Sequence, residues 1–208
     1  MPSIHSTYSS THLVPRITRD SLMTLEAYSR ARAEFRARVI EHKKHRTVAL
    51  GDHITLIFED ELTIRYQIQE MLRVERIFEE AGIQDELAAY NPLIPDGANW
   101  KATMMIEYTD IEERQRMLAR LIGIEDRVWV QVAGHARVHA IADEDLERQN
   151  ATKTSSVHFL RFELERAMAR ALRNGAALAI GVDHPAYSVS TPSVDAATRI
   201  SLAGDLVD

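Results

Sequence analysis

The sequence predicts an α+β fold: a mixed, mainly antiparallel sheet with several packed helices, in a single compact domain with polar tails. Apolar stripes at helical spacing occur along the chain, between short apolar runs that are typical of strands. The segments between the strands are helices and hairpins of varied type, which favours α+β over a regular alternation of strand and helix. A length of 208 residues suits one domain with a substantial core.

The folded domain is expected to span residues 22–187, between two flexible tails. Residues 1–21 begin with a polar stretch rich in Ser and Thr, and residues 188–208 mix Ser, Thr, Ala and Asp with weak periodicity. This composition is typical of poorly ordered chain ends. Both segments are therefore predicted to lie outside the folded unit.

The first part of the chain is predicted to form two long helices on either side of a strand region. Thr24 is a candidate N-cap for a helix that ends in the basic run at residues 42–46. Residues 48–58 then have the apolar character of strands around a central turn. Asp60 is placed to cap the second helix, which is expected to stop at Gly82.

The rest of the chain is predicted to contain three helices, one hairpin and three further strands. The expected elements are a short helix at 84–90, a strand at 101–108, a helix at 110–123, a hairpin with strands at 127–132 and 137–141, a strand at 156–164, a helix at 165–174 and a strand at 177–182. Residues 156–164 also fit a helical stripe, but a strand buried on both faces is preferred.

Composition and motifs exclude several classes of function. The chain has no cysteine, which excludes disulfides, thiolate metal sites and cysteine nucleophiles, and fits a cytoplasmic protein. A net charge of −6 argues against nucleic acid or an anionic membrane as a partner. No apolar run is long enough to cross a membrane. The sequence also lacks a phosphate loop, a dinucleotide fingerprint, a Gly-x-Ser-x-Gly elbow and a His-Glu-x-x-His motif.

The net charge hides an uneven distribution along the chain. Residues 1–46 hold nine Lys and Arg against four Asp and Glu, whereas residues 47–208 hold sixteen against twenty-seven. One interpretation is a basic N-terminal helix that packs on an acidic body. The other is a docking surface for an anion or an acidic partner on that helix.

Glu75 is the most informative anomaly in the sequence. On a helical wheel it falls inside the apolar stripe that runs from Ile64 to Phe78, and Glu70 lies towards one edge of that face. A carboxylate that faces a core must be paired, hydrogen-bonded or bound to a metal. A buried salt bridge from Glu75 to an arginine such as Arg161 is the structural alternative.

Two histidines complete the candidate site. His158 lies in an apolar strand, and His184 follows the last strand, just before a proline. Glu75, His158 and His184 are the candidate metal ligands, in a nitrogen and oxygen site suited to iron, manganese or zinc. The candidate ligand-binding groups are Glu70, Arg161 and Glu163. A satisfied core histidine at 158 and a surface histidine at 184 are the alternative interpretations.

Five ordered motifs carry a resemblance over about residues 22–187. They are VALGD at 48–52, YQIQEMLR at 66–73, NPLIPDG at 91–97, HFLRFEL at 158–164 and GVDHP at 181–185. Together they resemble an uncharacterised bacterial domain-of-unknown-function family that is often encoded beside rubrerythrin-like proteins. The resemblance implies no catalytic residues. It implies a link to peroxide or iron-dependent redox stress through the neighbouring genes, and it favours a strand at 158–164.

The leading hypothesis is a cytoplasmic α+β protein with a partly buried site for a metal or small ligand, in a redox-stress module. Glu75 and His158 are then inner ligands or an acid/base pair, and His184 is an entrance ligand or proton shuttle. The alternative is a non-catalytic interaction protein that docks a rubrerythrin-like or other acidic partner through the basic helix at residues 24–46. A homodimer is compatible with both hypotheses.

Overall fold

The computed structural model describes residues 16–144, 148, 150 and 152–207. The helices are α1 (Leu25–Lys43), α2 (Glu61–Val74), α3 (Glu80–Tyr90), α4 (Ile111–Arg120), α5 (Arg166–Arg173) and α6 (Ala196–Ala203), with short 3-10 helices η1 (Arg19–Ser21), η2 (Asn91–Leu93) and η3 (Glu125–Arg127). The strands are β1 (Thr47–Leu50), β2 (Ile54–Glu59), β3 (Asn99–Ile106), β4 (Val128–Val132), β5 (Val138–His139), β6 (Ile141–Ala142), β7 (Val157–Glu163), β8 (Leu178–His184) and β9 (Tyr187–Thr191). The predicted α+β class is confirmed.

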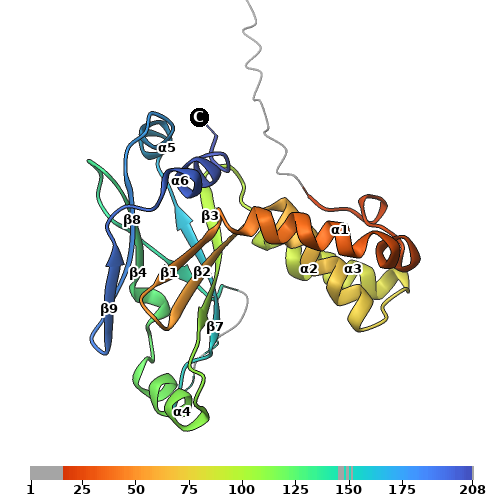
Figure 1. Cartoon of the computed structure of the whole chain (residues 1–208), viewed down its shortest axis with the longest axis horizontal. Helices are drawn as coiled ribbons and strands as arrows, with labels where there is room; N and C mark the ends of the chain where they lie inside the picture. Colours follow the sequence, from red (N-terminus) through yellow and green to blue (C-terminus); the bar gives the residue numbers. More distant parts are fainter. Residues whose placement is uncertain (1–15, 145–147, 149, 151, 208) are drawn as a thin grey trace, which may run out of the picture.

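Two antiparallel sheets pack against each other, and helices α1, α2 and α3 extend away from them on one side (Figure 1). Sheet A has the strand order β1-β2-β3-β7-β6, and sheet B has the order β5-β4-β8-β9. The predicted hairpin is present as β4 and β5, but its last predicted residue, Ile141, begins β6, which pairs with β7 in the other sheet. No helix in the described part of the chain is both long and apolar enough to cross a membrane.

The main core lies between the two sheets. Alternate residues of sheet A, such as Trp100 and Met104, are buried in it together with residues of sheet B, such as Val130. The other residues of sheet A lie on its outer face, where Ile57, Thr103 and Phe159 are aligned across β2, β3 and β7. The period of two along a strand therefore gives sheet A one face in the core and one face towards the helices.

An ion-pair network joins α1 to α2 away from the sheets. The Glu70 carboxylate accepts hydrogen bonds from Tyr28 Oη at 2.6 Å and from two nitrogens of Arg32 at 2.7 and 2.8 Å. Arg73 adds longer contacts from the next turn of α2. The hydrogen bonds from Arg32 are the main reason that the pKa of Glu70 is lowered to about 2, with smaller contributions from Tyr28 and Arg73.

A buried guanidinium joins the helices to sheet A and to the C-terminal helix. Arg46 is only 1 % exposed and donates hydrogen bonds to the carbonyl groups of Phe58 and Glu59 at 2.8 and 3.0 Å. Its counter-ion is Asp205, just after α6, with an N–O distance of 2.5 Å. Asp60, the N-cap of α2, lies 3.5 Å from the same guanidinium. The ends of α1, β2 and α6 and the start of α2 therefore meet at one buried cation.

The prediction that Glu75 faces the core is wrong, because α2 ends at Val74. Arg76 has a φ of 56°, and the Ile77 N–H returns to the Leu72 carbonyl at 2.9 Å, as in a Schellman cap. Glu75 is the exposed C-cap residue at the end of α2 that lies away from the sheets. The predicted apolar stripe is interrupted there, since a helical wheel applies only while the backbone stays helical.

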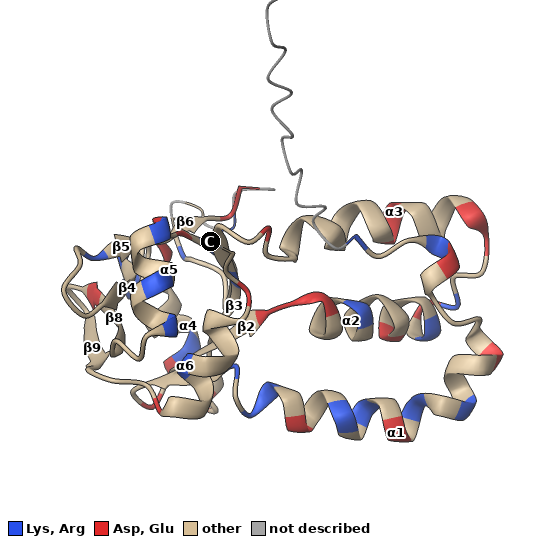
Figure 2. Cartoon of the chain, turned by 90° about the horizontal axis from the view of Figure 1, so that it is seen from above, with Lys and Arg blue, Asp and Glu red and all other residues tan. Residues whose placement is uncertain are grey.

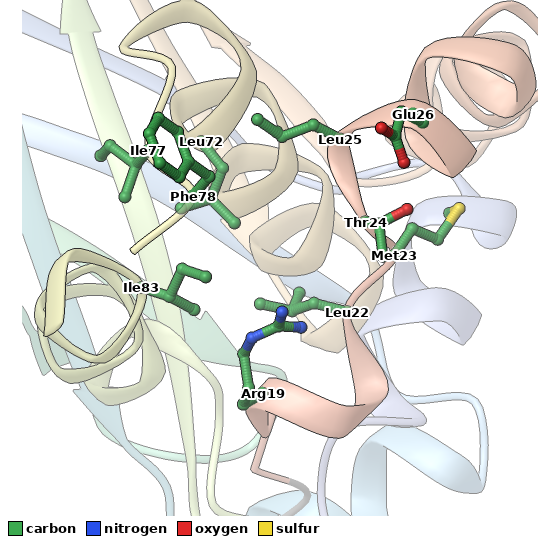
Figure 3. Close-up of a pocket in the computed structure, with 10 residues that line it drawn as sticks. All are labelled: Arg19, Leu22, Met23, Thr24, Leu25, Glu26, Leu72, Ile77, Phe78 and Ile83. Carbon is green, nitrogen blue, oxygen red and sulfur yellow. The ribbon is translucent and has the colours of Figure 1, made fainter. Parts of the chain in front are cut away.

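Beyond this cap, the chain lines a surface hollow at the outer end of the helices (Figure 3). The hollow has a volume of about 410 Å³, and its apolar lining includes Leu22, Leu72, Ile77 and Phe78. Phe78, which was predicted to lie in the core stripe, is 72 % exposed. The segment between α2 and α3 therefore replaces the continuous helix that was expected to reach Gly82.

The predicted C-terminal tail is also wrong, since residues 188–207 belong to the fold. Strand β9 pairs with β8, and α6 buries Leu202 and Ala203. The Val207 N–H bonds to the Gly97 carbonyl at 2.7 Å. Weak periodicity concealed these elements because β9 is an edge strand with half-exposed residues and α6 is short.

The folded unit also begins before residue 22. Ile17 is buried, and its N–H and C=O are both bonded to the side-chain amide of Asn91, at 2.9 and 3.0 Å. The part of the predicted N-terminal tail at residues 1–15 lies outside the described residues. The boundary is therefore corrected to Ile17 or earlier.

We expect Glu70→Gln to destabilise the protein by about 1 kcal/mol at neutral pH, because it removes a charge-assisted pair with Arg32 that solvent partly screens. The pKa of Glu70 is lower in the folded state than its usual value of 4.5. The difference in the free energy of unfolding between the wild type and Glu70→Gln is therefore fully present above about pH 4.5. This difference is lost as the pH falls towards 2. Urea unfolding of both proteins across this range measures it, and a difference that does not change with pH would contradict it.

Candidate metal centre

Three segments bring an imidazole and two carboxylates to one buried point. His158 comes from β7, Asp143 from the residue just after β6, and Glu125 from η3. One ligand atom from each residue lies within 4.8 Å of the others. His158 is fully buried and Glu125 is 3 % exposed. Among the described residues, this is the group of three whose side chains meet the distance requirement for a metal site.

The strand periodicity places His158 on the inner side of sheet A. It is the second residue of β7, on the same face as Leu160 and Phe162 in the core. Asp143 is attached to the same strand, because its N–H bonds to the Phe159 carbonyl at 2.9 Å and its Oδ1 accepts from the Phe159 N–H at 3.0 Å. Its φ of 47° is in the left-handed region, which Asp adopts more readily than most residues.

The imidazole of His158 is held from both sides. Nδ1 lies 2.6 Å from Asp143 Oδ2, and Nε2 lies 2.9 Å from Thr154 Oγ1 and 3.1 Å from the Ser155 carbonyl oxygen. A carboxylate and a carbonyl can only accept hydrogen bonds. With the Nδ1 proton donated to Asp143, Nε2 can accept a hydrogen bond from the Thr154 hydroxyl, whereas the Ser155 carbonyl beside it suits a second ring proton or a metal cation.

Glu125 is the least satisfied member of the cluster. Within the described chain its hydrogen-bond partner is Thr154 Oγ1, at 3.5 Å, and His158 Nε2 lies at 3.9 Å. Both distances are longer than a good hydrogen bond to a carboxylate. A buried carboxylate without close donors is costly unless a cation compensates its charge.

Asp143 differs from Glu125 because its carboxylate has several close partners. Besides His158 and the Phe159 N–H, Arg148 Nε lies 3.2 Å from Oδ1. The Arg148 guanidinium also lies over the Phe159 ring, 4.6 Å from the centroid. These contacts fix Asp143 as the group that orients His158.

The order Asp143, His158, Thr154 has the carboxylate–imidazole–hydroxyl arrangement that activates a nucleophile in hydrolases. Thr154 is only 1 % exposed and His158 is fully buried, so a substrate has no access to this hydroxyl in the folded protein. An ion can bind such a closed site as the chain folds. The burial therefore favours metal binding or a structural network over acyl transfer.

His184 does not join this cluster. Its Nδ1 accepts a hydrogen bond from the Ala186 N–H at 3.1 Å, so Nε2 carries the proton and donates to the Ile122 carbonyl at 3.2 Å. Both ring nitrogens are therefore engaged by backbone groups in this structure. The proposed meeting of Glu75, His158 and His184 is not found, since only His158 belongs to the group.

The predicted ligand-binding residues form ion pairs elsewhere. Arg161 pairs with Glu144 through two hydrogen bonds of 2.7 Å and also contacts Glu163, rather than Glu75. These groups lie on the outer face of sheet A, whereas Glu70 joins α1 to α2. They do not form one site with His158.

Sequence reasoning missed Glu125 and Asp143. Asp143 opens the acidic segment at residues 143–148, which marks it as a candidate, but nothing in that segment shows that it reaches back to β7. Glu125 precedes β4 and carries no signal in its own neighbourhood. Both residues are brought to His158 by long-range contacts.

Comparisons with other proteins support the fold and leave the function open. A family model described as "Protein of unknown function (DUF3501)" matches residues 16–206. The chain is similar to a crystal structure of a novel protein of unknown function from Burkholderia pseudomallei K96243, with 58 % identity and a TM-score of 0.89. The match covers 93 % of this chain and 100 % of that one. No curated protein matches the chain.

We expect Glu125→Gln to stabilise the metal-free protein slightly, because a buried amide costs less than a buried carboxylate without close donors. His158→Ala should instead destabilise it by about 2–4 kcal/mol, since it opens a cavity and removes the hydrogen bond from the imidazole to Asp143 Oδ2. Thermal unfolding in the presence of a chelator measures both. A large loss of stability in Glu125→Gln would mean that the carboxylate is well satisfied without an ion.

Proposed function

We propose that this chain, which belongs to the DUF3501 family of proteins of unknown function, binds one divalent metal ion at the cluster of Glu125, Asp143 and His158. The observation that carries the proposal is the buried Glu125 carboxylate, which lacks a close donor and lies beside an imidazole nitrogen that faces oxygen atoms. A cation at this point would neutralise the Glu125 carboxylate and accept the lone pairs of His158 Nε2 and the neighbouring oxygen atoms.

The contacts suggest a separate role for each residue. His158 Nε2 and the Glu125 carboxylate are the expected ligands, and Thr154 Oγ1 and the Ser155 carbonyl are the nearest further oxygen donors. Asp143 holds Nδ1 on the other side of the ring, which is the usual role of a carboxylate behind a metal-binding histidine.

The donor set indicates which ions to expect. One imidazole with several oxygen atoms suits manganese, iron(II) or zinc, and the absence of thiolates removes the preference for softer ions. The oxygen-rich surroundings favour manganese and iron(II). A role in peroxide or iron-dependent redox stress, implied by the resemblance to the family, stays a prediction that iron or manganese binding would support.

A closed site of this kind is structural rather than catalytic. Glu125 leads through η3 into β4 of sheet B, whereas His158 belongs to sheet A. An ion between them would link the two sheets at one end of the core. Its removal is expected to loosen this end of the sandwich.

The test is metal analysis and thermal unfolding after incubation with manganese, anaerobic iron(II) or zinc. We expect one ion per chain and a rise in Tm of about 5 °C or more when the free ion exceeds its Kd a hundredfold. Glu125→Gln and His158→Ala should lose both the ion and the rise in Tm. His184→Gln and Glu75→Gln are the matched controls, and both should keep the ion. A wild-type protein that stays metal-free with all three ions would refute the proposal.

The second candidate function, docking of a rubrerythrin-like or other acidic partner through α1, stays a prediction with weaker support. Arg32 and Arg46 are used in ion pairs inside the protein. The exposed basic residues of α1 alternate with acidic ones (Figure 2). The exposed acidic residues are Glu26, Glu34 and Glu41, and the exposed basic ones are Arg30, Arg36 and Arg38. The surface of α1 is therefore less basic than its sequence.

For this function, reversing the charges of Arg36, Lys43 and Lys44 should abolish a salt-sensitive complex with a purified rubrerythrin-like protein, because long-range attraction between exposed charges is screened by salt. Analytical ultracentrifugation at low and high salt measures the complex. A complex that survives the reversal, or none at low salt with the wild-type protein, would reject docking through α1.

A further inference from the structure

The outer face of sheet A and the helices beside it enclose two adjoining pockets of about 260 and 310 Å³. They share Leu93 and Phe159, so together they form one cleft between α2 and the outer face of sheet A. The larger pocket has apolar walls that include Pro92, Leu93 and Phe159, and its charged lining residues are Lys101, Glu144 and Arg161, of which Lys101 is the single amine. A small apolar pocket with a few polar groups is the usual form of a ligand site.

Lys101 is unusual because the carboxylates around it already accept hydrogen bonds from other residues. It lies on β3 directly between Glu59 of β2 and Arg161 of β7. Glu59 accepts hydrogen bonds from the hydroxyl groups of Thr63 and Thr103 instead, at 2.5 and 2.7 Å. Across the ranges that the structure describes, the Lys101 amine has neither a hydrogen bond nor an ion pair.

The neighbouring charges also disfavour the protonated amine. The Arg161 guanidinium is fixed beside it by Glu144 and Glu163. Burial, followed by this adjacent positive charge, lowers the pKa of Lys101, although the negative charges of Glu144, Asp96 and Glu163 act in the opposite direction. A half-buried amine beside a second cation is a common arrangement for a nucleophilic lysine.

We propose that Lys101 is a reactive amine that forms an imine with a small aldehyde or ketone bound in this pocket. The nitrogen lone pair attacks the carbonyl carbon, and a proton moves from nitrogen to oxygen to give a carbinolamine. Loss of the hydroxyl group as water, with the remaining N–H proton, then gives the C=N bond. No oxidant or reductant is consumed. The apolar walls favour a carbonyl compound with a short hydrocarbon chain.

The chain has four lysines, of which Lys43 lines the smaller pocket and Lys44 and Lys153 are exposed, so the two exposed lysines serve as internal controls for Lys101. The experiment treats the full-length protein with hexanal and cyanoborohydride at neutral pH, which reduces any imine to a stable secondary amine, and locates the adducts by peptide mass spectrometry. We expect Lys101 to be modified several-fold faster than the exposed Lys153, with a rate that saturates as hexanal is raised. Modification of Lys153 should increase linearly.

Two further measurements distinguish an amine in a ligand-binding pocket from an amine that is only accessible to solvent. Hexanol, which has the same chain but no carbonyl, should slow the modification of Lys101 and leave Lys153 unchanged. Lys101→Arg should lose the fast adduct alone, with an unchanged circular dichroism spectrum. A Lys101 rate that is no faster than that of Lys153, or one that neither saturates nor responds to hexanol, would overturn the proposal. The saturation of the rate and the effect of hexanol are both measured on the wild-type chain, so these two tests remain valid even if Lys101→Arg fails to fold.

Discussion

The guanidinium of Arg46 is the point at which the separate parts of this protein meet. A buried cation needs close acceptors, and those of Arg46 come from β2 and from Asp205 beyond α6. The last turn of α1, sheet A and the C-terminal segment are therefore held in one arrangement. This arrangement positions the helices beside the outer face of sheet A, where the cleft with Lys101 is found. The cleft thus depends on an ion pair that lies outside it.

Strand β7 contributes residues to both the metal cluster and the cleft. Its alternation directs His158 into the core and Phe159 and Arg161 to the outer face, so that the metal cluster and the cleft lie on opposite sides of one strand. Asp143 binds the His158 ring and the backbone of Phe159, whose side chain lines the cleft. Neither proposal requires the other.

Much of the fold follows from local patterns. Thr24 and Asp60 cap helices as their side chains predict, and β7 is a strand with its predicted alternation. Prediction failed where packing outweighs periodicity. The end of α2 is set by a left-handed Arg76, a position that usually favours glycine, so Glu75 was assigned to a helical face that does not exist. Strand β9 has too few buried residues to be recognised without its partner β8.

By itself, the sequence determined the α+β class and the absence of thiolate chemistry, and it singled out His158 as an ionisable residue on an apolar strand. It did not determine the partners of His158, which are Asp143 and Glu125 rather than Glu75 and His184. The spacing of residues along a helix or strand predicts only contacts between residues that are a few positions apart in the sequence. Glu125 and Asp143 lie 33 and 15 residues from His158 along the chain, and only the packing of η3 and the turn after β6 against β7 brings them together.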